Sequence, residues 1–325
     1  MLKFVQCAAL LVIPLLLAGS AHAQAQWPER TVKVIVPQPA GASTDIIART
    51  FTDALSIVFK QPFVIDNRPG ANGIIGTDFV AHAPNDGYTL LFSYAGAQVV
   101  NQSLYKTARY DGARDFAAIA QVGSGGNFLV VPPSMPVNNL AEFVAYVKAK
   151  PPGSLSYGSW GVGSGGHLGM EAIKLHEGID LQHVPYKSVI ASLQDLMAGQ
   201  IQVAFSSAAS ALPLAKGGQI KIIAIAGPRR SELAPDIKTL TEQGVTFNLS
   251  PWYGFFAPAG TPPEIVAKLN AEINRLIALP EMAQRWRILG FDRMPIKTPE
   301  EFSEQVKTDI GAWGAIVRAS NIKAE

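Results

Sequence analysis

The sequence predicts an α/β fold divided into two lobes. Short runs of β-branched residues alternate with amphipathic helical stretches, which is typical of sheets whose strands are mostly parallel. A length of 325 residues favours two lobes of ordinary size over one. Two apolar extended stretches, 128–131 and 252–257, are each followed by proline. If both cross between the lobes, they form a two-strand hinge that permits closure around a ligand in the cleft.

These crossings place residues 24–124 and 249–325 in the first lobe and residues 125–248 in the second. The alternative is one continuous doubly wound domain, which the same order of strands and helices permits. The sequence shows no internal repeat of fixed period and no low-complexity tract.

Residues 1–23 have the pattern of a secretory signal peptide. Lys3 supplies the positive charge, an apolar run follows, and Ala21-His22-Ala23 forms the cleavage site. The apolar run is shorter than the roughly 20 residues that a membrane anchor needs. We therefore expect a soluble periplasmic protein that begins near Gln24. Cys7 is the only cysteine and would be removed, so we expect no disulfide and no thiol nucleophile.

The charge and the motifs exclude several classes of protein. The formal net charge of +2 is spread along the chain without a basic run, so we expect no nucleic-acid partner. No hydrolase elbow, zinc-protease or P-loop motif occurs. The later histidines lack the spacing of metal ligands; they are His82, His167, His176 and His183. The sequence thus predicts no catalytic residue, no metal and no cofactor.

The expected strands, most of them followed by turn residues and a helix, are 32–36, 63–66, 89–93, 128–131, 155–159, 182–185, 203–206, 221–226 and 252–257. The first helix begins near Thr44, and its apolar stripe is Ile47, Phe51, Leu55 and Val58. Towards the C-terminus, Thr261-Pro262-Pro263-Glu264 and Thr298-Pro299-Glu300-Glu301 each predict a capping box that opens a helix. The stripes of these helices are Ile265, Leu269, Ile273 and Leu276, then Phe302, Val306, Ile310, Trp313 and Val317.

The loop after the first strand predicts an anion site. It consists of small residues and leads into a helix N-terminus, where unpaired N–H groups and the helix dipole favour a carboxylate. The expected ligand-binding residues are Gln38, Ala40, Gly41, Ala42, Ser43, Thr44 and Asp45. The alternative is that Ser43 or Thr44 only caps the helix.

The segment 155–167 repeats this arrangement in the other lobe. Its Gly161-x-Gly163-x-x-Gly166 pattern matches the dinucleotide fingerprint, but the next strand ends in Pro185-Tyr186-Lys187 instead of an acidic residue that binds ribose. We interpret the loop as a second anion cradle. The expected ligand-binding residues are Trp160, Gly163, Ser164, Gly165, Gly166 and His167. For His167, simple packing is the alternative.

Two such loops in different lobes would grip a carboxylate from both sides. Neither loop contains Lys or Arg, so neutral donors would hold the anion, with an affinity near micromolar, about −8 kcal/mol. Ser93, Tyr94 and Ser206, at strand ends, complete the predicted site. Tyr94, Trp160 and Trp252 would wall a pocket for an aromatic ring, unless they belong to the core.

Ordered motifs along the mature chain point to a family: Trp27-Pro28, Val34-Ile35-Val36-Pro37, Pro39-Ala40-Gly41-x-Ser43-Thr44-Asp45, Asp66-Asn67-Arg68-Pro69-Gly70, Asp86-Gly87-Tyr88, Tyr157-Gly158-Ser159, His183-Val184-Pro185-Tyr186-Lys187 and Ala257-Pro258-Ala259-Gly260-Thr261. In these motifs the chain resembles the Bug proteins, the extracytoplasmic receptors of tripartite tricarboxylate transporters.

The resemblance implies a class II periplasmic-binding-protein fold with the ligand cleft between two lobes. It also implies that the loops 38–45 and 161–167 hold the ligand carboxylate. Where relatives have an aromatic residue before the first loop and a second glycine within it, this chain has Gln38 and Ala42. Ser206 replaces the Asp or Asn of many relatives, which argues against an amino-acid ligand.

We therefore expect a monomeric periplasmic receptor that captures a dicarboxylate, a tricarboxylate or an aromatic carboxylate and delivers it to a membrane permease. Two alternatives remain open. One is a receptor that serves a sensor kinase, and the other is an exported α/β hydrolase.

Overall fold

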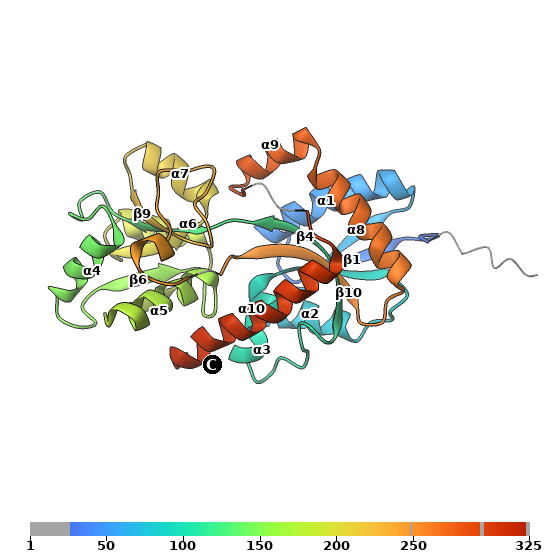
Figure 1. Cartoon of the computed structure of the whole chain (residues 1–325), viewed down its shortest axis with the longest axis horizontal. Helices are drawn as coiled ribbons and strands as arrows, with labels where there is room; N and C mark the ends of the chain where they lie inside the picture. Colours follow the sequence, from blue (N-terminus) through green and yellow to red (C-terminus); the bar gives the residue numbers. More distant parts are fainter. Residues whose placement is uncertain (1–26, 248, 293–295, 323–325) are drawn as a thin grey trace, which may run out of the picture.

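The computed structural model describes residues 27–247, 249–292 and 296–322, so the predicted signal peptide and Cys7 lie outside the described residues. Two lobes lie side by side along the long axis of the molecule (Figure 1). The first lobe contains strands β1 (Val32–Val36), β2 (Phe63–Asn67), β3 (Thr89–Tyr94), β4 (Phe116–Ser124) and β10 (Trp252–Pro258). The second contains β5 (Asn127–Val131), β6 (Ser156–Ser159), β7 (Gln182–Pro185), β8 (Val203–Ser206) and β9 (Lys221–Ala226).

Helices cover both sheets. Those of the first lobe are α1 (Ser43–Phe59), α2 (Ile74–Ala81), α3 (Asn101–Leu104), α8 (Pro263–Ile277), α9 (Pro280–Ile288) and α10 (Pro299–Ala319), with short helical turns η1 (Ala71–Gly73) and η2 (Gly96–Val100). Those of the second are α4 (Leu140–Lys148), α5 (Gly165–Glu177), α6 (Val189–Met197) and α7 (Ala208–Lys216), with the turn η3 (Thr241–Gln243). The predicted two-lobed α/β fold is therefore confirmed.

Each sheet is mixed, which differs from the expected mostly parallel arrangement. The strand orders are β2-β1-β3-β10-β4 and β7-β6-β8-β5-β9. Strand β10 runs antiparallel to β3, and β5 runs antiparallel to β8. The reason is the path of the chain. A strand that arrives from the neighbouring lobe enters at the edge where the parallel strands end, so it must run in the opposite direction.

The chain crosses between the lobes just before the two stretches that were expected to cross. Strand β4 belongs to the first sheet and β5 to the second, and only Gly125 and Gly126 separate them. The stretch 128–131 thus lies within the second sheet. Strand β4 was not predicted, because its alanines favour strands weakly and the strand is stabilised by its pairing with β10. The lobe limits at 124/125 and 248/249 stay a prediction.

Of three predicted helix features, the apolar stripe of α1 and the capping box of α10 are confirmed, and the capping box of α8 is wrong. The stripe of α1 is buried at Ile47, Phe51 and Leu55. Thr298 and Glu301 form the predicted capping box of α10. The box at Thr261 is wrong, because Pro262 is the N-cap of α8 and the Thr261 hydroxyl donates to the Pro258 carbonyl oxygen at 2.8 Å.

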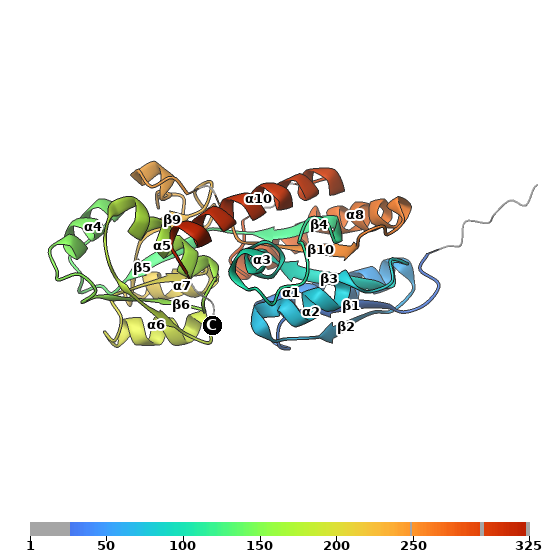
Figure 2. The same ribbon diagram turned by 90° about the horizontal axis from the view of Figure 1, so that it is seen from below.

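Helix α10 joins the two lobes. It packs on β4 and also contacts α3 and α5, and Figure 2 shows it reaching from the first lobe to the second. On its inner face, Asp309 accepts a hydrogen bond of 2.6 Å from the Trp252 indole nitrogen. Trp252 opens β10, so this buried bond fixes the strand at the point where the chain returns to the first lobe.

Candidate functional site

The carboxyl ends of the parallel strands face the boundary between the lobes. Strands β1 and β3 are parallel, so their ends share one edge of the first sheet. Beyond β3, Leu104 of α3 lies so close to Gly163 of the second lobe that a Cβ on Gly163 would come within 2.3 Å of it. Ligands of open α/β sheets bind at such edges.

The first loop connects β1 to the N-terminus of α1. Its N-cap is Ala42, with extended backbone and no side-chain cap. The Thr44 hydroxyl donates to Gln38 Oε1 at 2.6 Å, and Ser43 is exposed. The alternative in which Ser43 or Thr44 only caps the helix is therefore wrong. The first-turn N–H groups of α1 have no side-chain acceptor at the N-cap and lie at the positive end of the helix dipole.

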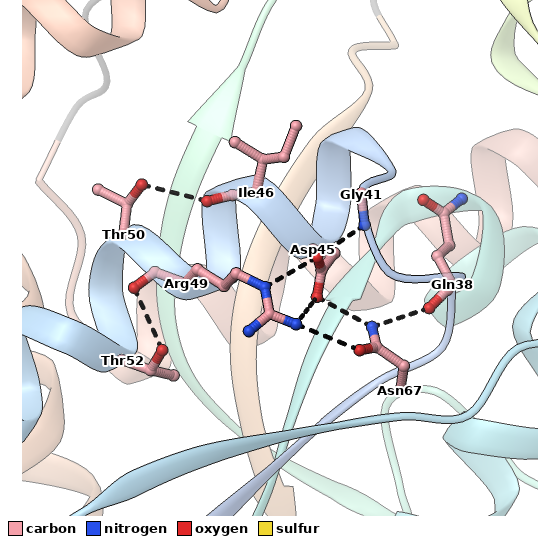
Figure 3. Close-up of polar contacts among 8 residues, drawn as sticks. All are labelled: Gln38, Gly41, Asp45, Ile46, Arg49, Thr50, Thr52 and Asn67. Carbon is pink, nitrogen blue, oxygen red and sulfur yellow. Dashed lines mark hydrogen bonds and ion pairs between the residues drawn. The ribbon is translucent and has the colours of Figure 1, made fainter.

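Asp45 holds this loop in place through its carboxylate (Figure 3). Its carboxylate accepts from the Gly41 N–H at 2.8 Å and from Asn67 Nδ2 at 3.0 Å, and it pairs with Arg49 at 2.9 and 3.0 Å. Burial alone would raise the pKa of Asp45, but the Arg49 guanidinium and the other donors lower it below its ordinary value. The structure thus places Asp45 as a brace of the loop, with both oxygens engaged.

Asn67 also holds the first loop, although the sequence prediction did not include it. Its side-chain nitrogen donates to the Gln38 carbonyl oxygen at 3.0 Å as well as to Asp45. Asn67 ends β2, which pairs in parallel with β1. Its position at the end of the neighbouring parallel strand is the signal that could have revealed it.

The second loop connects β6 to the N-terminus of α5. Ser164 is the N-cap and accepts from the His167 N–H at 3.3 Å. Gly163 has φ +75°, a conformation that favours glycine. The Trp160 ring covers the first turn of α5, because a Cβ on Gly166 would lie 2.7 Å from it. Trp160 therefore packs against the N-terminus of α5.

The Gly163 N–H is occupied inside the loop. It donates to His167 Nδ1 at 3.0 Å, so His167 braces the backbone and does not merely fill space. The predicted site residues Gly165 and Gly166 provide the first turn of α5, whose N–H groups have no partner within the helix. Asn127, absent from the prediction, lies beside this turn, with its Nδ2 atom 2.8 Å from the position of a Cβ on Gly165.

The predicted residues outside the two loops are bonded or packed within the lobes. Ser93 and Ser206 are fully buried at strand ends, and the Ser206 hydroxyl donates to the Ser207 carbonyl oxygen at 3.2 Å. The Tyr94 hydroxyl donates to the Asn72 carbonyl oxygen at 2.9 Å, and burial raises its pKa. Trp252 packs against Phe302 in the core, away from a pocket wall.

Over the described ranges, no three or more His, Cys, Asp and Glu side chains gather in a group that could hold a metal ion. Within the same ranges, no helix is both long and apolar enough to cross a membrane.

Comparison with known proteins identifies the family of this chain. A family model described as the tripartite tricarboxylate transporter family receptor matches residues 47–322. Protein BugT of Bordetella pertussis is 32% identical over 299 residues, which cover 91% of each chain.

Solved structures extend the likeness to the whole fold. The R. palustris protein Rpa4515, described with adipate, has a TM-score of 0.80 at 32% identity, covering 91% of this chain and 99% of that one. MatC of Rhodopseudomonas palustris, described with bound malate, has a TM-score of 0.77 at 31% identity, covering 90% of this chain and all 100% of the other. The predicted resemblance is confirmed, and the family is one of receptors and not of enzymes. The chain belongs to the tripartite tricarboxylate transporter receptor family.

Proposed function

We propose that this protein is a periplasmic receptor that captures a small carboxylate between its lobes and delivers it to the membrane permease of a tripartite transporter. The observation that carries the proposal is the pair of helix N-termini, of α1 and α5, one in each lobe, each directly after a strand of a parallel pair. Each offers backbone N–H groups and a positive dipole end to an anion.

The chemistry of the two loops supports a carboxylate with neutral donors around it. The segments 37–44 and 160–167 contain no Lys or Arg. The one acidic residue next to them, Asp45, is buried, pairs with Arg49 and accepts from the Gly41 N–H. A few charge-assisted bonds from neutral donors, about 1.5 to 3 kcal/mol each before desolvation, permit release as well as capture.

Among carboxylates, we place linear dicarboxylates first. Two separated N-termini match a molecule with a negative charge at each end, and structural relatives are described with adipate and with malate. Aromatic carboxylates stay in the proposal because the partly buried Trp160 ring lies beside the second N-terminus.

The test is a thermal-shift titration of the purified protein with adipate, malate, citrate and benzoate. A ligand at 100 times its Kd should stabilise the folded protein by about 2.7 kcal/mol, and the shift should grow with concentration. The matched control is adipamide, which has the length of adipate without its charges. Stabilisation by adipamide equal to that by adipate, or none by any carboxylate, would contradict the proposal.

A further inference from the structure

Two histidines of the second lobe are stacked beside the glycine loop 161–164. The rings of His167 on α5 and His183 on β7 have centroids 3.9 Å apart and planes inclined by 8°. The Tyr157 ring of β6 lies against both, at centroid distances of 6.2 and 4.9 Å. His167 is 5% exposed, so this is a packed cluster behind the loop and not part of its open face.

Each histidine is bonded to a different part of the loop. His167 Nδ1 accepts the Gly163 N–H at 3.0 Å. His183 Nε2 lies 2.7 Å from the Ser159 hydroxyl, and the same hydroxyl accepts the Gly161 N–H at 3.2 Å. Two alternate backbone N–H groups of the loop are therefore tied, directly or through Ser159, to one pair of stacked rings.

The hydrogen bond from the Gly163 N–H defines the protonation state and the tautomer of His167. Because Nδ1 accepts, the ring must be neutral with its proton on Nε2. A proton on Nδ1 would face the Gly163 N–H and break the bond.

Burial of the two rings also favours the neutral state. Burial, then the charge of Lys174, lowers the pKa of His167 to about 4. Burial, then the neighbouring His167, lowers the pKa of His183 to about 3. Glu171 acts against this and raises the pKa of His183, but less than burial lowers it. Glu171 accepts from the Tyr157 hydroxyl at 2.7 Å and from Lys174 Nζ at 2.9 Å, and Asp180 lies 3.9 Å from the same Nζ. The acidic groups are thus paired with Lys174 and Tyr157 and not with the imidazoles.

We propose that His167 is a positioning residue for ligand capture, whose Nδ1 atom fixes the glycine loop while the stacked His183 ring holds His167 in that orientation. The inference rests on the proposed function, because the loop that His167 fixes leads into the N-terminus of α5. The N–H groups at the start of α5 can bind a ligand with a defined geometry only if the preceding loop is itself held in place by contacts such as the one from His167.

Three variants separate this role from simple packing. His167→Asn keeps an acceptor, Oδ1, close to the place of Nδ1, whereas His167→Leu fills the space without an acceptor. His176→Asn is the matched control, because His176 lies on the same helix with its side chain 48% exposed and beside Glu177.

The first measurement needs no ligand. Amide hydrogen exchange should be about tenfold faster at Gly163 in His167→Leu, as expected for one lost hydrogen bond, and close to wild type in His167→Asn and His176→Asn. Unchanged exchange at Gly163 in His167→Leu would overturn the inference. Side-chain nitrogen NMR of the wild type gives a check that needs no variant, since a protonated Nδ1 on His167 would also overturn it.

The second measurement is the affinity for the carboxylate that stabilises the wild type most. We expect His167→Leu to bind about tenfold more weakly and His167→Asn to recover most of that loss. Failure of the wild type to bind any carboxylate would contradict the proposed function, whereas equal binding by wild type and His167→Leu would contradict this inference alone.

Discussion

At the scale of single residues, Ser43 allows one backbone donor to be removed without disturbing the helix. It is the first residue of α1, a position where proline is well accepted, and the preceding Ala42 has φ −69° and ψ 160°, which a following proline tolerates. We predict that Ser43→Pro weakens carboxylate binding at least about tenfold, because a charge-assisted bond from its N–H is lost. Calorimetric titration measures the change.

Ser43→Ala is the control for this prediction, because it removes the hydroxyl and keeps the N–H. It should retain most of the affinity if the backbone does the binding. Equal losses in Ser43→Ala and Ser43→Pro would assign the interaction to the hydroxyl, and unchanged affinity in both would remove the first loop from the site.

The stacked histidines predict a pH dependence of stability. Their pKa values in the folded protein, about 4 for His167 and about 3 for His183, lie below the ordinary value of 6.5. Below pH 6.5 the unfolded chain therefore binds more protons than the folded protein, and the free energy of unfolding must fall as the pH falls. We expect a loss of roughly 2 to 4 kcal/mol between pH 7 and pH 5, measured by urea unfolding.

The comparison for this prediction is the variant His167→Asn/His183→Asn, which lacks both titrating groups. Its stability should depend much less on pH over the same interval, whatever its absolute value. Parallel curves for the variant and the wild type would show that other groups cause the loss.

At this scale the sequence located the loops but not the role of every atom. Glycines and hydroxyl residues before a helix predict an anion cradle from local chemistry alone. Whether Asp45 faces a ligand or Gly41 depends on Arg49 and on Asn67, which comes from another strand. A hydrogen-bond partner that is distant in the sequence leaves no local pattern, so the role of Asp45 in holding the loop could be seen only in the folded structure.

At the scale of elements, the capping box of α10 contributes measurably to the free energy of unfolding. The Thr298 hydroxyl accepts from the Glu301 N–H at 3.2 Å, and the Glu301 carboxylate accepts from the Thr298 N–H at 2.9 Å. We predict that Thr298→Ala lowers the free energy of unfolding by about 1 kcal/mol. Thr308→Ala, an exposed position inside the same helix, should be neutral or slightly stabilising, since alanine is the better helix former. Equal effects of the two substitutions in chemical unfolding would contradict the cap.

Strand β4 shows where prediction from sequence reaches its limit for elements. Regular amphipathic helices such as α8 reveal themselves by the spacing of their apolar residues. Strand β4 contains three alanines, Ala117, Ala118 and Ala120, which give it no clear strand pattern. The strand forms because β10 pairs with it along its whole length. Its partner lies more than a hundred residues away and enters from the other lobe, so no local pattern could specify it.

At the scale of the whole molecule, a contact around Asp292 ties the lobes together. Asp292, which follows α9 of the first lobe, is buried and accepts from the Ser231 hydroxyl at 2.7 Å and from the Glu232 N–H at 2.9 Å. Just before it, Gly290 packs so closely on α7 that a Cβ there would lie 2.3 Å from the Ala209 nitrogen. Because Ser231 and Glu232 follow β9 of the second lobe, this contact opposes separation of the lobes.

Asp292 should therefore influence the balance between open and closed forms. Asp292→Ala removes both acceptor bonds, and we predict a larger radius of gyration in X-ray scattering without ligand. Carboxylate affinity should fall about tenfold, because binding must then supply the closure that this contact helped to maintain. Asp292→Asn retains an acceptor oxygen and should stay closer to the wild type, while Asp236→Ala, an exposed change in the second lobe, should alter neither quantity. Identical scattering and affinity for Asp292→Ala and the wild type would mean that α10 and the crossing strands alone set the distance between the lobes.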